Sequence, residues 1–216
     1  MGRPKQFLEL LGEPALLHTL RAFEAVSGVA RIYTVGEAER VEALAAEAGI
    51  SKYAGCAAPG ESRSGSTMSG LGLLERESEG SVVLIHDGSR CLVTPNLIER
   101  VAEAVRGSDA EGVIPALPVS DTVKSVRGGV VRETLNRSGL WAVQTPQAFR
   151  LGSLRRAYGV PRGELARATD DASLVEAQGG EVRVVEGERT NIKLTAPEDL
   201  IFARAILESR LAETGS

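Results

Sequence analysis

The run Val82-Val83-Leu84-Ile85 followed by His86-Asp87-Gly88-Ser89-Arg90 constrains the fold of this chain more than any other segment. Four apolar residues without alternation are typical of a strand buried on both faces, as in a parallel sheet. Ligands of open α/β sheets bind beyond the carboxyl ends of the strands, so Asp87, Gly88 and Arg90 are expected where chemistry occurs. A carboxylate suits Mg²⁺, a glycine lets backbone approach a phosphate, and an arginine can hold a phosphate through two hydrogen bonds. Asp-Gly is also common in ordinary turns, and this alternative stays open on the segment alone.

The rest of the chain alternates between helix and strand signals. Helices are expected at Pro14–Val26, Glu37–Ala48, Ser64–Glu77, Pro95–Arg106, Asp170–Gln178 and Pro197–Leu211. Strands are expected at Val29–Val35, Lys52–Ala58, Val82–Ile85, Val113–Val119 and Val182–Val185. This alternation predicts an α/β protein with a doubly wound, mainly parallel sheet. With 216 residues, the chain can bury a full core as a single domain that spans residues 1–216.

One segment interrupts the alternation. Val123–Val126 and Val130–Thr134 flank Gly128-Gly129, which is the signature of a hairpin with a two-residue turn. An isolated two-stranded hairpin is only marginally stable in water. We therefore expect an arm at about residues 120–138 that either packs on its own domain or grips a second subunit.

Composition excludes several classes of partner. The net charge is −4 and no block of lysines or arginines occurs, which argues against nucleic acid. No run of apolar residues is long enough to span a bilayer, and the N-terminus lacks a signal-peptide pattern, so we predict no membrane partner and a cytoplasmic location. No Gly-x-Gly-x-x-Gly follows a predicted strand, which argues against a dinucleotide site.

Further motifs surround the Asp87 loop in a fixed order along the chain. They are Pro4-Lys5-Gln6-Phe7-Leu8, Gly60-Glu61-Ser62-Arg63-Ser64-Gly65-Ser66, Asp121-Thr122-Val123-Lys124, Asn136-Arg137, Leu140-Trp141-Ala142-Val143-Gln144-Thr145-Pro146-Gln147-Ala148-Phe149, Thr169-Asp170-Asp171-Ala172-Ser173-Leu174, Asn191-Ile192-Lys193-Leu194-Thr195 and Pro197-Glu198-Asp199-Leu200. In this order, from Pro4 to about Leu200, the chain resembles the 2-C-methyl-D-erythritol 4-phosphate cytidylyltransferases of the non-mevalonate isoprenoid pathway.

The resemblance implies a Rossmann-like nucleotidyltransferase domain that uses Mg²⁺. A polyol phosphate would attack the α-phosphorus of CTP and release pyrophosphate, and the enzyme would be a homodimer joined through the hairpin arm. Such a displacement is catalysed mainly by positioning and by neutralising phosphate charge. Two alternatives stay open: a cytidylyltransferase for another polyol phosphate, such as ribitol 5-phosphate, and a degenerate homodimeric module that binds nucleotide weakly.

The resemblance also implies roles for individual residues. Lys5 would stabilise the transition state, while Arg137 and Lys193 would hold the attacking phosphate in line. The nucleotide-binding set is Gly60, Glu61, Ser66, Asp87 and Gly88, with Asp87 also holding the metal ion. The substrate-binding set is Arg90, Thr122, Arg137, Thr169 and Lys193.

Three other polar residues receive supporting roles. His86 is expected to support the Asp87 loop, because a phosphate nucleophile is already deprotonated at neutral pH and needs no base. Asp170 and Asp171 could form a second metal pair, but an acidic cap at a helix N-terminus is the preferred interpretation.

The family's opening segment differs from this chain. Family members begin with an apolar strand and a glycine-rich loop of the type Ala-Ala-Gly-x-Gly-x-Arg, whereas only Met1-Gly2-Arg3 precede Pro4 here. We expect a start codon placed too late rather than a truncated product, because the downstream motifs are intact. Without an internal strand, buried backbone groups lose partners, so the chain as written is expected to be poorly stable and to bind CTP weakly.

Overall fold

The computed structural model describes residues 5–165 and 168–214. Its helices are α1 (Ala15–Glu24), α2 (Ala38–Glu47), α3 (Arg63–Gly72), α4 (Pro95–Arg106), α5 (Leu151–Tyr158), α6 (Arg162–Leu165), α7 (Asp171–Ala177) and α8 (Asp199–Thr214), with short 3-10 helices η1 (Lys5–Phe7) and η2 (Arg137–Gly139). Its strands are β1 (Glu9–Leu10), β2 (Glu13–Pro14), β3 (Ile32–Val35), β4 (Tyr53–Ala57), β5 (Val82–Ile85), β6 (Gly112–Pro118), β7 (Lys124–Arg127), β8 (Val130–Thr134), β9 (Trp141–Val143), β10 (Gln147–Arg150) and β11 (Val182–Glu186).

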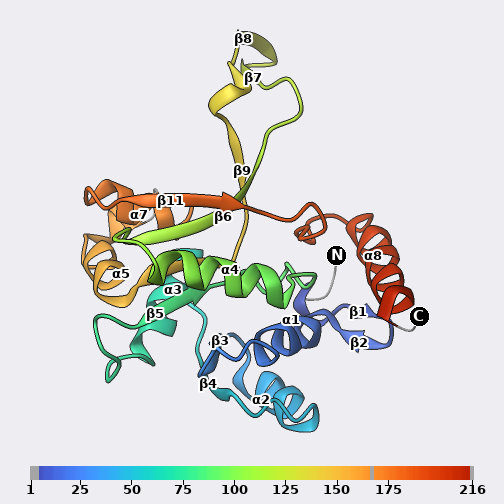
Figure 1. Ribbon diagram of the computed structural model, residues 1–216. Helices are drawn as coiled ribbons and strands as arrows, with labels where there is room; N and C mark the ends of the chain where they lie inside the picture. The colour runs from blue at the N-terminus through green and yellow to red at the C-terminus, as the bar shows by residue number, and fades with distance from the viewer. Residues whose placement is uncertain (1–4, 166–167, 215–216) are drawn as a thin grey trace.

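The central sheet has five strands in the order β11-β6-β10-β5, and β9 also pairs with β6 (Figure 1). β11 is parallel to β6, while β10 is antiparallel to both β6 and β5. It follows that β5, β6 and β11 run in one direction, so their carboxyl ends lie at one end of the sheet. The predicted α/β fold is confirmed, with β10 as an antiparallel strand inside the sheet.

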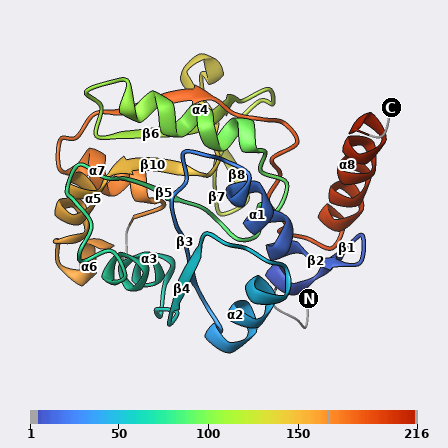
Figure 2. The ribbon, with the colours of Figure 1, turned by 60° about the horizontal axis from the view of Figure 1, so that its bottom comes forward.

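Helices cover both faces of this sheet, as in a doubly wound fold (Figures 1 and 2). One apolar core contains residues of α1, α2 and α4, and the other contains residues of α5, α6 and α7. In β5, Val82 and Leu84 pack against the first core, and Val83 and Ile85 pack against the second. The predicted burial of β5 on both faces is therefore confirmed, although each of its four residues keeps part of its surface exposed.

The strands β3 and β4 form a separate parallel pair. Within the described residues, β3 pairs only with β4 and β5 pairs only with β10, so each leaves one edge without a strand partner. This open edge explains the residual exposure of β5. Residues 1–4 lie outside the described part of the chain, and the expected upstream strand stays a prediction.

The predicted arm projects from the body of the protein (Figure 1). β7 and β8 are antiparallel, and the turn residues Gly128 and Gly129 have positive φ of 59° and 76°, which glycine adopts without strain. All residues of both strands are exposed. The alternative in which the arm packs on its own domain is therefore wrong.

The helix α8 covers the loop that follows β11. Ala203 is fully buried in a third apolar cluster with Leu10, Leu92 and Leu194. Phe202, in contrast, is 59% exposed, so α8 carries apolar residues on more than one face. None of the described helices is long and apolar enough to span a bilayer.

Candidate functional site

Four charged residues meet at the carboxyl end of β5, and we call them the Asp87 cluster: Asp87, Arg63, Arg90 and Lys193. Lys193 Nζ donates a hydrogen bond of 2.7 Å to Asp87 Oδ2. Arg63 Nε lies 3.5 Å from Asp87 Oδ1, and Arg90 Nε lies 4.0 Å from Asp87 Oδ2. These contacts bring together segments from α3, from the end of β5 and from the loop that follows β11.

The cluster keeps Asp87 ionised. Burial alone would raise the pKa of the Asp87 carboxyl, but the hydrogen bond from Lys193 and the charges of Lys193, Arg63 and Arg90 outweigh it. The net effect is a pKa below the usual value. A carboxylate with a side chain only 17% exposed and surrounded by cations is available as an anionic ligand at neutral pH.

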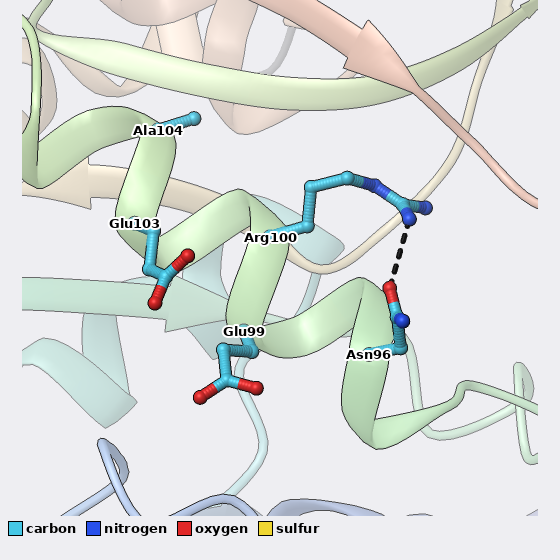
Figure 3. A pocket seen from close by; sticks show the side chains of 5 residues that line it. All are labelled: Asn96, Glu99, Arg100, Glu103 and Ala104. Carbon is cyan, nitrogen blue, oxygen red and sulfur yellow. Dashed lines mark hydrogen bonds between the residues drawn. The ribbon is translucent and has the colours of Figure 1, made fainter.

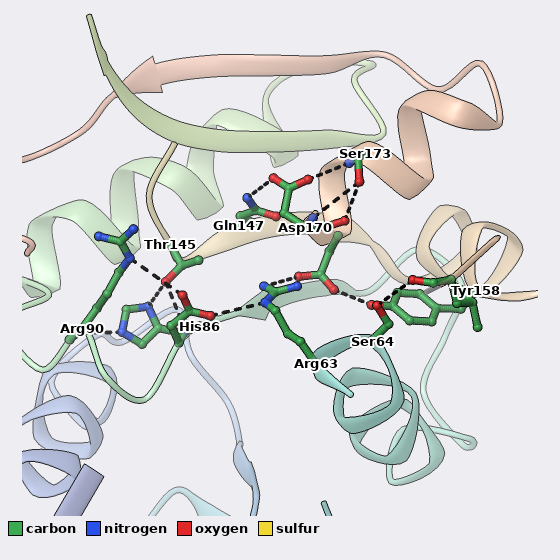
Figure 4. Close-up of polar contacts among 12 residues, drawn as sticks. Arg63, Ser64, His86, Arg90, Thr145, Gln147, Tyr158, Asp170 and Ser173 are labelled. Atoms are coloured by element: carbon green, nitrogen blue, oxygen red, sulfur yellow. Dashed lines mark hydrogen bonds and ion pairs between the residues drawn. The ribbon is translucent and has the colours of Figure 1, made fainter. Parts of the chain in front are cut away.

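A chain of hydrogen bonds through His86 holds the Asp87 loop (Figure 4). His86 Nε2 is 3.1 Å from the carbonyl oxygen of Arg90, and its Nδ1 is 3.0 Å from Thr145 Oγ1. The backbone N–H of Asp87 donates to the same Thr145 oxygen over 3.1 Å. A carbonyl can only accept, so Nε2 carries the proton of the neutral ring and Nδ1 accepts from the Thr145 hydroxyl.

The protonation of His86 agrees with this arrangement. Burial, opposed by hydrogen bonds to Arg90 and Thr145 and by the charge of Asp87, lowers the pKa of His86 from 6.5 to about 4. The ring is therefore neutral at pH 7. The predicted supporting role of His86 is confirmed by these contacts.

Arg90 ties the cluster to neighbouring segments. Its Nη1 donates to the carbonyl oxygen of Asn191 over 2.9 Å, and its Nη2 donates to that of Val143 over 3.3 Å. The Nε of Arg90 is buried and has no hydrogen-bond partner among the described residues. This nitrogen faces Asp87 at ion-pair distance, so it adds charge to the cluster without a hydrogen bond.

The segment Gly60–Ser66 forms a compact loop at the start of α3. Ser62 caps the helix by accepting from Gly65 N over 3.0 Å, and Gly60 N donates to Ser66 Oγ over 3.1 Å. A Cβ on Gly60 would lie 2.4 Å from the carbonyl carbon of Gly65, so only glycine fits there. Glu61 is exposed at the tip of this loop. A helix N-terminus of this kind presents backbone N–H groups that suit a phosphate.

Lys5 reaches the same region from the start of the described chain. Its Nζ donates to the carbonyl oxygen of Thr195 over 2.7 Å, two residues after Lys193. The turn at Thr195 is in turn fixed by Asp199, whose carboxylate accepts from the backbone N–H groups of Thr195 and Ala196. The segment between β11 and α8 thus contains Lys193 and also binds Lys5 through the Thr195 carbonyl.

Asp170 and Asp171 make different contacts in the structure. Asp170 caps α7 in a reciprocal arrangement with Ser173, which confirms the predicted helix cap and fixes the segment after the exposed Thr169. Asp171 is fully buried and accepts from Arg63 Nη2 over 2.7 Å. Within the described ranges, no three His, Cys, Asp or Glu side chains lie close enough together to hold a metal ion.

Two predicted substrate residues lie apart from the Asp87 cluster. Thr122 is exposed at the base of the arm, and Arg137 is exposed in η2. The Arg137 Nη1 donates to the carbonyl oxygen of Ser120. In the part of the chain that the structure describes, no ion pair joins Arg137 to Asp87, whose cationic partners are Arg63, Arg90 and Lys193.

Three residues outside the predicted site sets also support the site: Arg63, Thr145 and Tyr158. Arg63 lies in the Gly60–Ser66 motif, and its position carries a usable sequence signal. A cation at the first position of a helix is unfavourable to the helix dipole, so an arginine there indicates an anionic partner. Tyr158 gave no such signal, because a tyrosine in an apolar helix face is typical of core packing.

A separate depression of about 480 Å³ lies along α4 (Figure 3). It is lined by Asn96, Glu99, Arg100, Glu103 and Ala104. Arg100 is held by Asn96 over 2.9 Å and by the carbonyl oxygen of Glu186 over 3.1 Å. None of the predicted site residues lines this depression, so it is not the candidate site.

Comparisons with known proteins agree on one family. A family model described as IspD, 2-C-methyl-D-erythritol 4-phosphate cytidylyltransferase, matches residues 1–209. A relative of that name from Rubrobacter xylanophilus is 63% identical over 97% of this chain and 90% of its own length. Another from Geobacillus kaustophilus is 47% identical over 98% of this chain and 92% of its own length.

Solved structures give the same result. A crystal structure of 4-diphosphocytidyl-2C-methyl-D-erythritol synthase matches with a TM-score of 0.83 and 32% identity, and covers 94% of each chain. The crystal structure of 2-C-methyl-D-erythritol 4-phosphate cytidylyltransferase from Thermus thermophilus matches with a TM-score of 0.76 and 33% identity. That match covers 95% of this chain and 94% of the other.

Proposed function

This chain belongs to the 2-C-methyl-D-erythritol 4-phosphate cytidylyltransferase family, and we propose that it transfers a cytidylyl group from CTP to 2-C-methyl-D-erythritol 4-phosphate. The acceptor phosphate attacks the α-phosphorus of CTP, the bond to the β-phosphate oxygen breaks, and pyrophosphate leaves. The observation that carries this proposal is the Asp87 cluster, in which one ionised carboxylate contacts three cations, one of them Arg63 of the Gly60–Ser66 loop. Such a site suits a reaction whose main requirement is to position and neutralise phosphates.

The nucleotide side of the site is formed by the Gly60–Ser66 loop, Asp87 and Gly88. Close packing of Gly60 on the first turn of α3 fixes backbone donors toward the triphosphate. Lys5 stabilises the charge that develops in the transition state. Its position on the carbonyl of Thr195 places its ammonium on the segment that also carries Lys193.

The acceptor side is formed by Lys193, Arg90 and Thr169. Lys193 touches Asp87, so the amine that receives the acceptor phosphate is adjacent to the carboxylate on the nucleotide side. Both ring nitrogens of His86 are engaged in hydrogen bonds, and its pKa is lowered to about 4, so this ring is not suited to act as a general base. This agrees with a nucleophile that is already deprotonated at neutral pH.

Asp87 is the residue that would hold Mg²⁺. Magnesium sites of phosphate-binding enzymes commonly use one or two carboxylates together with substrate phosphates and water. A single ionised carboxylate at the mouth of a phosphate loop fits this pattern. The bound ion would neutralise charge on the triphosphate.

A homodimer formed through the arm would complete the site. Val126 and Val131 are cross-strand partners on one face of the hairpin and are 56% and 55% exposed, and Trp141 near its base is 44% exposed. Exposed apolar side chains on a two-stranded arm favour burial against a partner, and twofold pairing is the commonest arrangement. Thr122 and Arg137, which lie apart from the Asp87 cluster of their own subunit, would then serve the partner's site.

The test is product analysis with several acceptors. The protein is incubated with CTP, Mg²⁺ and either 2-C-methyl-D-erythritol 4-phosphate or ribitol 5-phosphate, and the product is followed by ³¹P NMR. We expect a CDP-linked diphosphate with the methylerythritol compound. Preferred turnover of ribitol 5-phosphate would assign the chain to another polyol phosphate, and nucleotide binding without any product would indicate the degenerate module.

A further inference from the structure

We propose that Arg63 is a positioning residue that orients Asp87 toward a metal-bound triphosphate, and that the buried pair Asp171 and Tyr158 holds Arg63 for this purpose. The inference rests on the proposed function, because it names how this chain aligns the carboxylate of the nucleotide site. It depends on one arginine, Arg63 (Figure 4), that contacts one acid through Nε and another through Nη2.

The first acid, Asp171, fixes the arginine. Asp171 is fully buried, and its Oδ2 accepts from Arg63 Nη2 over 2.7 Å. Its Oδ1 accepts from the hydroxyl of Tyr158, which is only 5% exposed. A buried carboxylate is strongly destabilising without a cation, so Arg63 cannot leave Asp171 at low cost.

Tyr158 acts as a permanent donor in this arrangement. Burial raises the pKa of the Tyr158 hydroxyl, and the neighbouring Asp171 carboxylate raises it further. The hydroxyl therefore keeps its proton and directs it at Oδ1. With Oδ1 occupied in this way, Oδ2 of Asp171 is left for Arg63.

The second acid, Asp87, is the one that Arg63 positions. Arg63 Nε lies 3.5 Å from Asp87 Oδ1, whereas Lys193 binds the other oxygen. The guanidinium uses different nitrogens for the two acids, and its planar fork fixes their relative direction. A lysine carries one point charge and cannot hold both acids in this geometry.

The start of α3 is fastened to the same unit by a second contact. Ser64 Oγ donates to the carbonyl oxygen of Leu165 over 3.1 Å, next to the Arg63–Asp171 ion pair. The loop Gly60–Ser66 thus has two fixed points on the α6–α7 side of the protein. Because Arg63 also contacts Asp87, the fixed position of this loop determines where the guanidinium meets the Asp87 carboxylate.

The charge pattern supports this role over a simple surface ion pair. Burial lowers the pKa of Arg63, but the charge and hydrogen bond of Asp171, followed by the charge of Asp87, raise it above its usual value overall. Both acids therefore stabilise the same cation. An arginine at the first position of α3 is placed against the helix dipole, and these acids compensate for that cost.

The experiment measures how much Mg²⁺ strengthens CTP binding. Calorimetric titrations with CTP are performed with and without Mg²⁺ and without acceptor, so that no turnover occurs, and the ratio of the two affinities is the readout. Variants are Arg63→Lys, which keeps the charge, and Tyr158→Phe, which removes one hydroxyl and keeps the ring. Matched controls are Arg156→Lys, a surface arginine paired with Glu111, and Tyr53→Phe, which loses a hydrogen bond to Thr34 away from the site.

We expect Arg63→Lys to reduce the gain, meaning the factor by which Mg²⁺ strengthens CTP binding, roughly tenfold, as loss of a residue that orients a metal ligand typically does. Tyr158→Phe should give a smaller reduction of about threefold by the same reasoning, and both controls should keep the gain of the wild type. In an Asp87→Asn background, Arg63→Lys should cause no further reduction, because it acts through Asp87.

Three results overturn the inference. They are an unchanged gain in Arg63→Lys, an equal loss of CTP affinity with and without Mg²⁺, and a further loss in the Asp87→Asn background. If Arg63→Lys does not fold, an unchanged gain in Tyr158→Phe overturns it instead. Failure of the proposed function is distinct, since the wild type would then make no CDP-linked product with either polyol phosphate.

Discussion

Replacing Gly60 with alanine tests whether the packed loop before α3 forms the nucleotide site. The new Cβ would lie 2.4 Å from the carbonyl carbon of Gly65, 2.7 Å from the nitrogen of Ser66 and 2.8 Å from the Cα of Gly65. All three atoms are backbone, and ordinary contacts begin at 3.4 Å. The loop must therefore move away from the first turn of α3 by about 1 Å, since backbone cannot yield as a flexible side chain does.

The size of the effect follows from this displacement. Overpacking of this kind costs about 1–3 kcal/mol of stability, and loss of the hydrogen bond from Gly60 N to Ser66 Oγ adds about 1 kcal/mol. A displacement of about 1 Å in groups that position a substrate can lower the rate by about 100-fold. We expect kcat/KM for CTP to fall at least about tenfold, with the KM for the acceptor little changed.

The assay combines steady-state kinetics with urea denaturation. Gly72→Ala is the matched control, because Gly72 ends the same helix and a Cβ there meets nothing within 4 Å. Alanine at that position should leave kinetics unchanged and stabilise the fold by about 0.4–1 kcal/mol. A Gly60→Ala variant with kcat/KM for CTP within about twofold of the wild type would refute the assignment of this loop to the nucleotide.

Four further predictions follow from the site and the fold. Asp87→Asn should fold normally but lose most Mg²⁺-supported turnover in a Mg²⁺ titration; unchanged turnover removes Asp87 from the mechanism. Between pH 6.5 and about 4, His86 binds a proton in the unfolded state but not in the native state, so the free energy of unfolding falls as the pH falls across this window, by at most about 3 kcal/mol. When the free energy of unfolding is measured by urea denaturation at several pH values, His86→Gln should lack this part of the pH dependence. An identical pH dependence in His86→Gln would contradict the neutral ring. Arginine at both Val126 and Val131 should shift a dimer toward monomer in analytical ultracentrifugation, and a wild type that is a fully active monomer at micromolar concentration refutes the arm-mediated dimer. A version with an apolar strand and a glycine-rich loop of the family type before Met1 should melt at a higher temperature and have a higher turnover rate. The reason is that β3 and β5 each have an unpaired edge in the part of the chain that the structure describes. Equal stability and activity of the two versions would show that these edges need no such strand.

Elements with strong local signals could be predicted from the sequence. The helix α4 has the predicted bounds, because Thr94 caps it, Pro95 occupies its first turn and Gly107 follows its end. The helix α3 ends at Gly72 instead of Glu77, since its glycines weaken the last turns. The strand β10 was missed because its four residues show no alternation, and its place between β5 and β6 depends on pairing that is distant in sequence.

The residues of the candidate site likewise fall into two groups, those that the sequence indicated and those that depend on contacts between distant parts of the chain or between chains. Asp87 directly follows an apolar strand, so the local sequence indicated it, whereas Gly60 was indicated by the family resemblance. The Arg63–Asp171 ion pair joins residues 108 positions apart, and no periodicity indicates such a contact. The proposed role of Arg137 depends on a second subunit, and the contacts within one chain do not specify such a role.

The most direct test of the central claim is an isotope measurement on the transferred group. The acceptor, 2-C-methyl-D-erythritol 4-phosphate, is labelled with ¹⁸O at its phosphate oxygens and is incubated with CTP, Mg²⁺ and the protein, and the products are separated and analysed by mass spectrometry. If the acceptor phosphate attacks the α-phosphorus of CTP, all of the label stays in the CDP-linked product and the pyrophosphate carries none. Label in the pyrophosphate, or release of pyrophosphate without a labelled diphosphate product, would contradict the account.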